Sequence, residues 1–459
     1  MVRVDARSSA RFVRRSIAGL VRRWYQTVTT ACRLEMQHDV SMWRASSVLH
    51  WNNNARGGAM ETIRGSDDRM VDARRVATYA AAALVLQLLF LVVWAVRYYG
   101  LHDRSAPMVG SDFAIFWATA RVALEHGPTA IFSPQWIQPI EAALRPFDNF
   151  APWPYPPTFL LVVIPFGLLS FVPALVLFGV LAIVCYAAVV ARLTRPLDGQ
   201  WRMVVAAFPG FIGAALSMQN AFLTVTAAAA ALLLLRSRPV IAGACIAILV
   251  VKPQYGVLFP LALICGRHWK ALVSACLFNA AIVATSVAVF GLQAWTAFLA
   301  FLPAFNRGVV EHGETLWRGM PSLVGGARAA GLSVQLAYGV QMCVAVAAAA
   351  AVVYVWTRRA ARFELRAAAL AAATLLVQPY YMYYDLLWLV LPLTFLLLDC
   401  RNVRPNRLES VVLALAWIAP AQAFAAVIAG TMWPVAAAVL MAVLAMVVRR
   451  ASDSTRLRA

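Results

Sequence analysis

The chain is organised as a series of long apolar blocks separated by short clusters of arginine. Many blocks have about the 20 residues that an α-helix needs to cross the hydrocarbon core of a bilayer. Only 13% of the residues are charged and 62% are hydrophobic, whereas a water-soluble globule has about 25% charged residues. The sequence therefore predicts an all-α polytopic membrane protein and excludes a soluble globular domain.

The net charge of +20 admits two interpretations. Basic chains often bind nucleic acid, but arginine clusters between apolar blocks also orient membrane proteins, because cytoplasmic loops carry an excess of Lys and Arg. The arginines here lie in such clusters, so membrane orientation explains the charge without a polyanion. We therefore predict membrane lipids as partners and no nucleic acid.

Residues 1–75 form a basic extension before the first long apolar block. The segment Arg11–Tyr25 interleaves arginines with apolar residues and could form an amphipathic helix on an anionic membrane surface. The extension could instead be disordered, or translation could start at Met70. We expect a disordered or mis-annotated extension, followed by a membrane domain over 76–450 and a cytoplasmic tail over 451–459.

The arginine clusters also predict the topology. The first span, about 76–96, follows a pair of arginines, so its start is cytoplasmic. All later clusters can be cytoplasmic only if the apolar stretch 157–191 makes a single net crossing. Pro165 and Pro173 interrupt this stretch, and a short re-entrant or interfacial piece followed by a full helix would fit, because proline breaks helices.

The remaining spans then alternate across the membrane. They are predicted at 203–217, 220–235, 239–252, 254–266, 270–290, 334–357, 365–379, 384–399, 408–428 and 433–448. The sequence thus predicts about twelve transmembrane helices with both termini in the cytoplasm.

This topology leaves the most polar segments on the outer side of the membrane. They are two long loops, about 97–156 and 291–332, and short turns at 217–220, 252–254 and 378–385. The first loop contains two amphipathic stretches, Phe113–Glu125 and Pro134–Leu144. We expect these to form helices that lie along the membrane surface.

Asp112 follows the first span in the sequence Gly110-Ser111-Asp112-Phe113. An aspartate before a helix can cap the free N–H groups of the first turn. The functional alternative is a carboxylate held near the headgroup level for chemistry. The spacing alone supports both interpretations of Asp112.

Lysine occurs only at Lys252 and Lys270 in a chain with 40 Lys and Arg residues. Lys270 lies in a basic cytoplasmic turn and needs no special explanation. Lys252 follows the apolar run Ala242–Val251, where a cation is costly unless it snorkels to the interface or meets an anion. We therefore consider both snorkelling and a lipid-phosphate partner.

Two further outer turns carry polar groups. Gln219 and Asn220 offer uncharged donors and acceptors that suit sugar hydroxyls, although both could cap a helix. The turn Gln378–Asp385 places tyrosines beside a carboxylate. Tyrosine is common at membrane interfaces, so Asp385 is the more informative residue, although it could also be a cap.

Motifs of soluble enzymes are absent from the sequence. It contains no Walker loop, dinucleotide fingerprint or HExxH motif, and its six histidines lack a metal-ligand spacing. The sequence therefore gives no indication of an ATP-driven pump or a metalloprotease, and we predict no metal site.

Taken in order, these motifs resemble glycosyltransferase family 87, a membrane family that includes polyprenol-phosphate-mannose-dependent α-1,2-mannosyltransferases. The resemblance runs from about Val76 to Asp399. It rests on Ser111-Asp112-Phe113, Pro154-Tyr155-Pro156-Pro157, Gln219-Asn220, Lys252-Pro253-Gln254, Met320-Pro321-Ser322 with Arg328, and Pro379–Asp385. Relatives often carry a glycine where this chain has Met218, and Trp-Asp-His-like residues where it has Tyr383-Tyr384-Asp385.

The resemblance implies a GT-C-type fold and an inverting transfer of a hexose such as mannose. The donor would be a polyprenyl-phosphate sugar, with no metal or other cofactor. The acceptor would be a lipid or glycan, on the periplasmic or outer face of the plasma (inner) membrane. The catalytic carboxylate of the family follows the first span and matches Asp112. The candidates for binding the donor phosphate are Lys252, Arg318 and Arg328, and those for positioning the sugar or acceptor are Gln219, Asn220, Gln254, Tyr384 and Asp385.

A secondary transporter and a polysaccharide polymerase or ligase are the alternatives. About twelve helices is also a common number for transporters, but these usually place ionisable residues near the bilayer midplane and contain internal repeats. Here the polar residues lie at one edge of the membrane and no repeat is evident. A polymerase or ligase would share the large outer loops, and the sequence leaves the sugar, the acceptor and the oligomeric state open.

Overall fold

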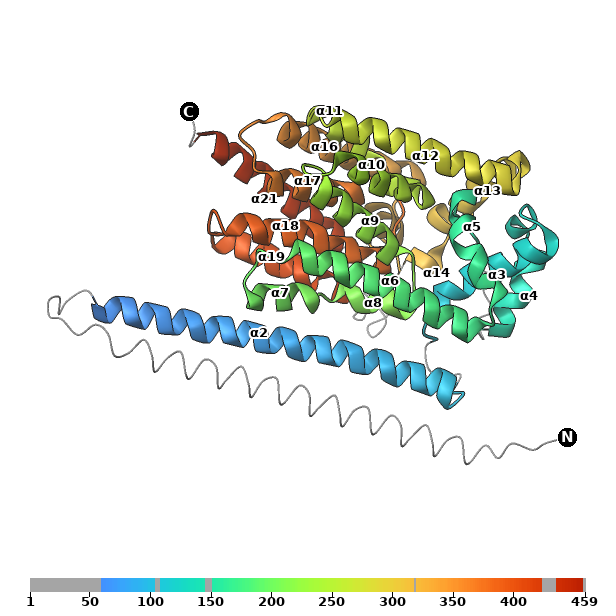
Figure 1. Cartoon of the computed structure of the whole chain (residues 1–459), viewed down its shortest axis with the longest axis horizontal. Coiled ribbons are helices and arrows are strands. Elements are labelled where there is room, and N and C mark those ends of the chain that lie inside the picture. The colour runs from blue at the N-terminus through green and yellow to red at the C-terminus, as the bar shows by residue number, and fades with distance from the viewer. Residues whose placement is uncertain (1–58, 104–107, 145–150, 318, 423–434, 457–459) are drawn as a thin grey trace. The chain divides into compact units, whose positions relative to one another are not determined.

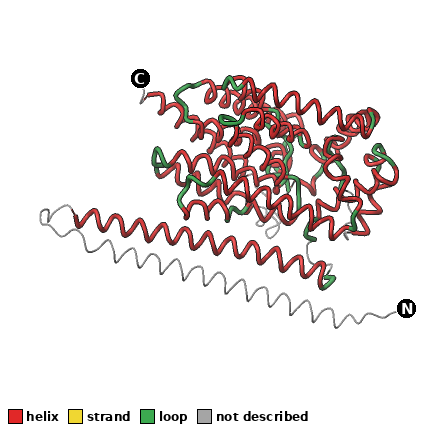
Figure 2. The backbone as a smooth tube through the Cα atoms, viewed as in Figure 1, coloured by secondary structure: helices red, strands yellow, loops and turns green. Residues whose placement is uncertain are grey.

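The computed structural model describes residues 59–103, 108–144, 151–317, 319–422 and 435–456. Helices and loops make up these residues, and none of them forms a strand (Figure 2). The all-α prediction is therefore confirmed for this part of the chain. Most of the predicted basic extension, residues 1–58, lies outside the described residues, whereas residues 59–75 belong to helix α2 (Ala59–Ala95).

The chain divides into two compact units, Met1–Val71 and Asp72–Ala459. The described part of the first unit, residues 59–71, is the beginning of α2. The helices that follow α2 all belong to the second unit, and Figure 1 labels them where there is room.

Six helical segments of the described chain are long and apolar enough to cross a membrane. They are Arg75–Gly100 (α2 with the turn η1), Phe171–Leu193 (α6), Trp269–Phe290 (α12), Val334–Thr357 (α16), Tyr383–Cys400 (η7 with α18) and Val435–Asp453 (in α21). Four shorter apolar segments are Pro157–Leu168, Ala221–Leu234, Pro239–Val251 and Pro253–Cys265. These segments support a membrane protein with several spans, while about twelve crossings stays a prediction.

The other helices and turns of the described chain either connect these segments or form parts of them. They are η1 (Val96–Gly100), α3 (Ser111–His126), η2 (Ala130–Phe132), α4 (Pro134–Leu144), α5 (Pro157–Val163), η3 (Ile164–Leu168), α7 (Gly199–Ala206), α8 (Gly210–Ser217), α9 (Ala221–Leu234), α10 (Pro239–Ala247), η4 (Ile248–Val251), η5 (Pro253–Tyr255), α11 (Leu258–Cys265), α13 (Leu292–Phe305), η6 (Asn306–Glu311), α14 (Glu314–Trp317), α15 (Leu323–Ala329), α17 (Phe363–Leu376), η7 (Tyr383–Leu389), α18 (Val390–Cys400), α19 (Arg407–Ile418), η8 (Ala419–Ala421) and α21 (Val435–Arg456). The predicted outer loop 291–332 is therefore largely helical.

Prolines decide where several predicted spans break. In the stretch 157–191, helix α5 gives way to η3 at Pro165 and the full helix α6 follows, as expected for a short piece before a long helix. Pro173 does not interrupt α6, because it lies in the first turn of this helix, where proline is tolerated. The prediction of one continuous span over 203–217 is wrong, since Pro209 separates α7 from α8.

The interior of the second unit is formed by α17 and by the segment Tyr383–Cys400. The segment Tyr383–Cys400 is 83% buried inside the protein, whereas an apolar 18-residue stretch of Arg75–Gly100 is 6% buried. The former is therefore a core element and the latter is exposed. Helix α17 packs against α16, α18 and α21. Residues 367–373 of α17 are alanine except for Leu370, and small side chains let neighbouring helices approach closely.

Helix α3 has nearly the bounds that the amphipathic pattern predicts. It is not a half-exposed surface helix, because only its last residues are exposed. Half of its residues are buried in an aromatic cluster. Phe116 packs edge-on against Trp153 and Phe159, at ring-centroid distances of 5.8 and 5.0 Å. This packing encloses α3 and fixes the residues at its N-terminus.

A buried ionic network joins the ends of α18, α19 and α21. Arg450 donates to Asp399 Oδ2 at 2.6 Å and to both carboxylate oxygens of Glu409 at 2.8 Å. Arg362 donates to the other oxygen of Asp399. All charges of this network have partners, as buried charges require.

Candidate functional site

Asp112 lies in the first turn of α3, and the residue that caps this helix is Gly110. The interpretation of Asp112 as the cap is therefore wrong. Gly110 has a positive φ of 83°, which glycine adopts without strain, and a Cβ there would come within 2.5 Å of Leu175. Its backbone N–H donates to the carbonyl of Leu216 at 2.6 Å, which ties the start of α3 to the end of α8.

The carboxylate of Asp112 accepts side-chain hydrogen bonds from Gln219 and Ser111. Gln219 donates through Nε2 to Oδ2 at 2.9 Å, and the Ser111 hydroxyl donates to Oδ1 at 3.1 Å. The amide oxygen of Gln219 accepts from the Tyr155 hydroxyl at 3.2 Å and from the backbone N–H of Asn220 at 2.8 Å. Gln219 is buried, so these partners hold its amide in the orientation that presents Nε2 to Asp112.

Met218 occupies a backbone conformation that glycine adopts more easily. It ends α8 in the left-handed conformation, with φ 52° and ψ 51°, which strains any residue that has a Cβ. Its side chain packs against Gly179 of α6, where a Cβ would lie 3.0 Å from Met218 Cε. The lack of a side chain at Gly179 therefore makes room for the methionine.

Lys252 and Asp385 are 133 residues apart in the chain and form an ion pair of 2.7 Å between Nζ and Oδ1. Their side chains are 3% and 0% exposed. The snorkelling interpretation of Lys252 is therefore wrong, because the ammonium meets an anion of the protein itself. The other oxygen of Asp385 accepts the backbone N–H of Met382 at 3.0 Å, so Asp385 also caps η7.

Two aromatic rings flank the ammonium of Lys252. Its Nζ lies 4.9 Å from the ring centre of Tyr255 and 5.5 Å from that of Tyr384, and the face of an aromatic ring attracts a cation. An ammonium has three N–H donors, of which Asp385 accepts one. Lys252 therefore retains the capacity to donate to a second anion.

Tyr155 and Tyr380 connect Asp112 electrostatically with the ion pair. Burial raises the pKa of both phenols well above the ordinary tyrosine value, and the negative charges of Asp385 and Asp112 raise it further. Helix α8 contacts η7, and the hydroxyls of Ser217 and Tyr383 lie 3.3 Å apart, so the turn that carries Gln219 lies next to the turn that carries Asp385. The two halves form one group of side chains, here called the site cluster: Asp112, Tyr155, Gln219, Asn220, Lys252, Tyr380, Tyr384 and Asp385.

Asn220 is the least satisfied member of the site cluster. Its side chain is fully buried at the start of α9, yet neither Oδ1 nor Nδ2 has a hydrogen-bond partner among the described residues. A buried amide without partners costs about 1–3 kcal/mol. Such a group suits a ligand hydroxyl, which can both donate and accept.

The other sequence-predicted residues lie in different surroundings. Gln254 is partly exposed in the turn η5. Arg328 donates to the backbone carbonyls of Glu311 and Leu332 and lies over the ring of Trp317 at 4.8 Å. These contacts hold the segment 306–332 together. Arg318 lies outside the described residues.

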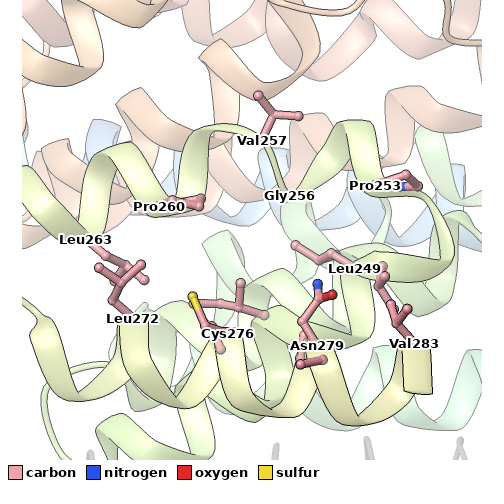
Figure 3. Close-up of a pocket in the computed structure, with 15 residues that line it drawn as sticks. Leu249, Pro253, Gly256, Val257, Pro260, Leu263, Leu272, Cys276, Asn279 and Val283 are labelled. Carbon is pink, nitrogen blue, oxygen red and sulfur yellow. The ribbon is translucent and has the colours of Figure 1, made fainter. Parts of the chain in front are cut away.

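An apolar cavity of about 520 Å³ lies next to Pro253, the residue that follows Lys252 (Figure 3). One wall comes from residues 246–263 and the other from α12. The labelled side chains in Figure 3 are apolar except for Asn279 and Cys276. Val257 and Leu277 nearby are 62% and 66% exposed, so this part of the surface suits contact with lipid.

Potential metal ligands are not gathered at one place in the described part of the chain. Among the described residues, no group of three or more His, Cys, Asp or Glu side chains is placed to hold an ion. The prediction that no metal takes part stays a prediction.

Sequence reasoning missed the roles of two tyrosines. Tyr155 was recognised only as part of a proline-rich segment, and Tyr255 was not singled out. The flanking prolines were the available signal for Tyr155, because they fix the backbone beside it. The cation–π contact of Tyr255 depends on the position of Lys252, which a local pattern does not reveal.

Comparison with protein families gives a match over part of the chain. The model of Glycosyltransferase family 87 matches residues 153–379, a range that contains Tyr155, Gln219 and Lys252 and that lies between Asp112 and Asp385. No curated protein and no solved structure matches the chain. With its apolar helices and this family match, the chain belongs to glycosyltransferase family 87.

Proposed function

We propose that this membrane glycosyltransferase moves a hexose, with mannose as the first candidate, from a polyprenyl-phosphate donor to a lipid or glycan acceptor. The observation that carries the proposal is the site cluster, in which Gln219 joins Asp112 to Tyr155 and Lys252 pairs with Asp385 beside the ring of Tyr384. An acid and an amine in one cluster suit a reaction that removes a proton and releases a phosphate. Family membership favours this transferase over a secondary transporter.

Asp112 would act as the general base. In this scheme the carboxylate takes the proton of an acceptor hydroxyl, and the acceptor oxygen attacks the anomeric carbon from the face opposite the phosphate. The bond between that carbon and the phosphate oxygen breaks, and its electron pair stays on the polyprenyl phosphate. Configuration therefore inverts. One carboxylate is enough because, unlike the leaving group in glycoside hydrolysis, the phosphate needs no protonation.

Lys252 would stabilise the departing phosphate. An ammonium away from bulk water stabilises developing negative charge more than it would in water. Asp385 would then act as a positioning residue that holds the ammonium in place. Arg318 and Arg328 are the candidates for a second cation at the phosphate.

The apolar cavity beside Pro253 would take the first isoprenoid units of the donor. Its volume of about 520 Å³ is within the range of ligand-binding cavities. Its position one residue beyond Lys252 would let a lipid tail lie in the cavity while its phosphate approaches the ammonium. Asn220, Gln254 and Tyr384 would position the sugar or the acceptor.

The outer, periplasmic face of the plasma (inner) membrane is the proposed location of the reaction. Arginines gather at 192–202, 236–238, 358–366 and 401–407, and such clusters are typical of cytoplasmic loops. The turns of the site cluster lie at the other ends of the intervening helices. A polyprenyl-phosphate sugar presented at that face would therefore meet the site cluster directly.

The test is sugar transfer by the full-length protein reconstituted with a polyprenyl-phosphate-mannose donor. Asp112→Asn should bind the donor normally and lower kcat by about 10²-fold or more, because it removes the base but keeps a side chain that can accept from Gln219. Glu125→Gln is the matched control, since Glu125 lies on the same helix and is exposed beside Arg121. Near-normal turnover of Asp112→Asn would reject the assignment.

A further inference from the structure

A second cavity, of about 340 Å³, is lined by basic side chains from three separate turns. They are Arg236 from the turn between α9 and α10, His268 from the turn between α11 and α12, and Arg359, Arg362 and Arg366 from the turn before α17 and its first residues. Glu364 is the one acidic side chain among these lining residues. Three turns that are distant in sequence thus bring positive charge to one cavity.

This cavity lies at the opposite end of two helices from the site cluster. Helix α9 runs from Asn220 to the turn of Arg236, and α17 runs from Arg366 toward the turn of Asp385. Each helix has 14 residues, which corresponds to a length of about 21 Å. The two locations are therefore separate and would lie toward opposite faces of the membrane.

The positive charge around the cavity is only partly neutralised. Arg362 is paired with Asp399, but neither Arg236 nor Arg359 forms an ion pair with another described residue. Arg366 donates through Nη2 to the carbonyl of Arg358 at 2.6 Å, whereas its buried Nε has no hydrogen-bond partner in the described part of the chain. A buried donor of a charged group without an acceptor is costly.

The pKa of His268 reflects the same excess of positive charge around the cavity. Burial lowers its pKa below the ordinary histidine value, and the charges of Arg366 and Arg236 lower it further. A positive neighbourhood disfavours a further cation. The same neighbourhood favours an anion.

Phosphate is the anion that this lining suits best. Guanidinium groups form paired hydrogen bonds with phosphate oxygens, and the N-terminus of α17, which carries positive partial charge, begins at the cavity with Phe363. Cytoplasmic arginines on their own need no ligand, because they also orient membrane proteins. That role does not require three turns to converge or a buried Nε to lack an acceptor.

We propose that this basic cavity binds a phosphate group, supplied either by the headgroup of an anionic membrane lipid or by a free phosphate. Basic pockets between membrane helices bind such headgroups in other proteins. The proposal concerns a location separate from the site cluster and does not depend on the transfer reaction. Its failure would leave the proposed function untouched, and the converse also holds.

The test measures thermal unfolding of the full-length protein in detergent with two probes. One is inorganic phosphate at constant ionic strength, and the other is phosphatidylglycerol in mixed micelles, compared with phosphatidylcholine. A ligand that binds only the folded state raises the unfolding midpoint. In the double variant Arg236→Gln/Arg359→Gln, the apparent affinity should fall at least about 10-fold, because charge-assisted hydrogen bonds are lost. Both residues are exposed, so the variant should still fold.

The matched control is Arg238→Gln, which removes an exposed arginine from the same turn as Arg236 without changing the cavity lining. It should respond like the wild-type protein. A response to inorganic phosphate identifies a free phosphate as sufficient, and a response to phosphatidylglycerol alone identifies a lipid headgroup. No response to either probe, an unchanged response of the double variant, or an equal loss in Arg238→Gln would overturn the proposal.

Discussion

Replacing Lys252 with methionine should destabilise the protein strongly. The distance of 2.7 Å between Nζ and Asp385 Oδ1 corresponds to a Coulomb attraction of about 6 kcal/mol at an effective dielectric constant of about 20. Desolvation of the two ions offsets much of this attraction. Removing one partner nevertheless leaves a carboxylate that is 0% exposed without a counter-charge, which costs about 3–5 kcal/mol.

The assay is equilibrium unfolding of the detergent-solubilised protein by a denaturing surfactant. Lys252→Met should lower the free energy of unfolding by about 3–5 kcal/mol. The double variant Lys252→Met/Asp385→Asn should recover most of this loss, because an amide needs no counter-charge and can still accept from Met382. Lys270→Met is the control, since Lys270 is exposed and its loss should change stability by less than about 0.5 kcal/mol.

The same variants separate a structural role of Lys252 from a role in donor binding. If the stabilised double variant still fails to transfer sugar, the ammonium is needed at the donor phosphate. If transfer returns with stability, Lys252 serves only to neutralise Asp385. A loss of less than about 1 kcal/mol in Lys252→Met would refute the reasoning about the buried pair, because a buried carboxylate without its partner cannot be that inexpensive.

Two further predictions concern packing and the buried ionic network. Gly179→Ala should destabilise the wild-type protein by about 1–3 kcal/mol, because its Cβ would press on Met218. In the Met218→Gly background the same substitution should stabilise the protein by about 0.5–1 kcal/mol, since alanine favours helices. Unfolding of the four proteins in this cycle gives the coupling energy, and additive effects would contradict the contact. Arg450→Met should lower the free energy of unfolding by about 3–5 kcal/mol, because it strips the buried Asp399 and Glu409 of a shared partner. At a temperature where it stays folded, kcat should be unchanged, and a large drop in kcat would show that the network affects the site cluster.

The sequence predicted the helical elements well where the signal was local. The stretches that begin near Phe113 and at Pro134 are helices within a few residues of the predicted bounds. The break at Pro165 followed from the covalent geometry of proline. The errors came where the position of a proline relative to a helix end decides the outcome. Pro173 is tolerated because it lies in the first turn of α6, and Pro209 divides a segment that the apolar pattern predicts as one span.

The contacts of the candidate site needed the tertiary structure. The charge of Lys252, which follows an apolar run, required either an anion or a route to the membrane interface. No pattern in the neighbouring sequence identified Asp385 as that anion. Gln219 was a candidate for a sugar contact, whereas its position 107 residues from Asp112 hid the hydrogen bond that joins them. Departures from the family pattern were visible, but only the left-handed backbone at Met218 gave one of them a physical meaning.

The sequence by itself determined that this protein is helical, that it has membrane character and that its polar turns are few. Those properties follow from the composition of the chain and from local effects, namely hydrophobic periodicity and the geometry of proline. The pairing of Lys252 with Asp385 and the convergence of arginines on one cavity were decided by the tertiary structure. The physical reason is that a buried charge must find a counter-charge in space, and the partner is set by helix packing rather than by distance along the chain.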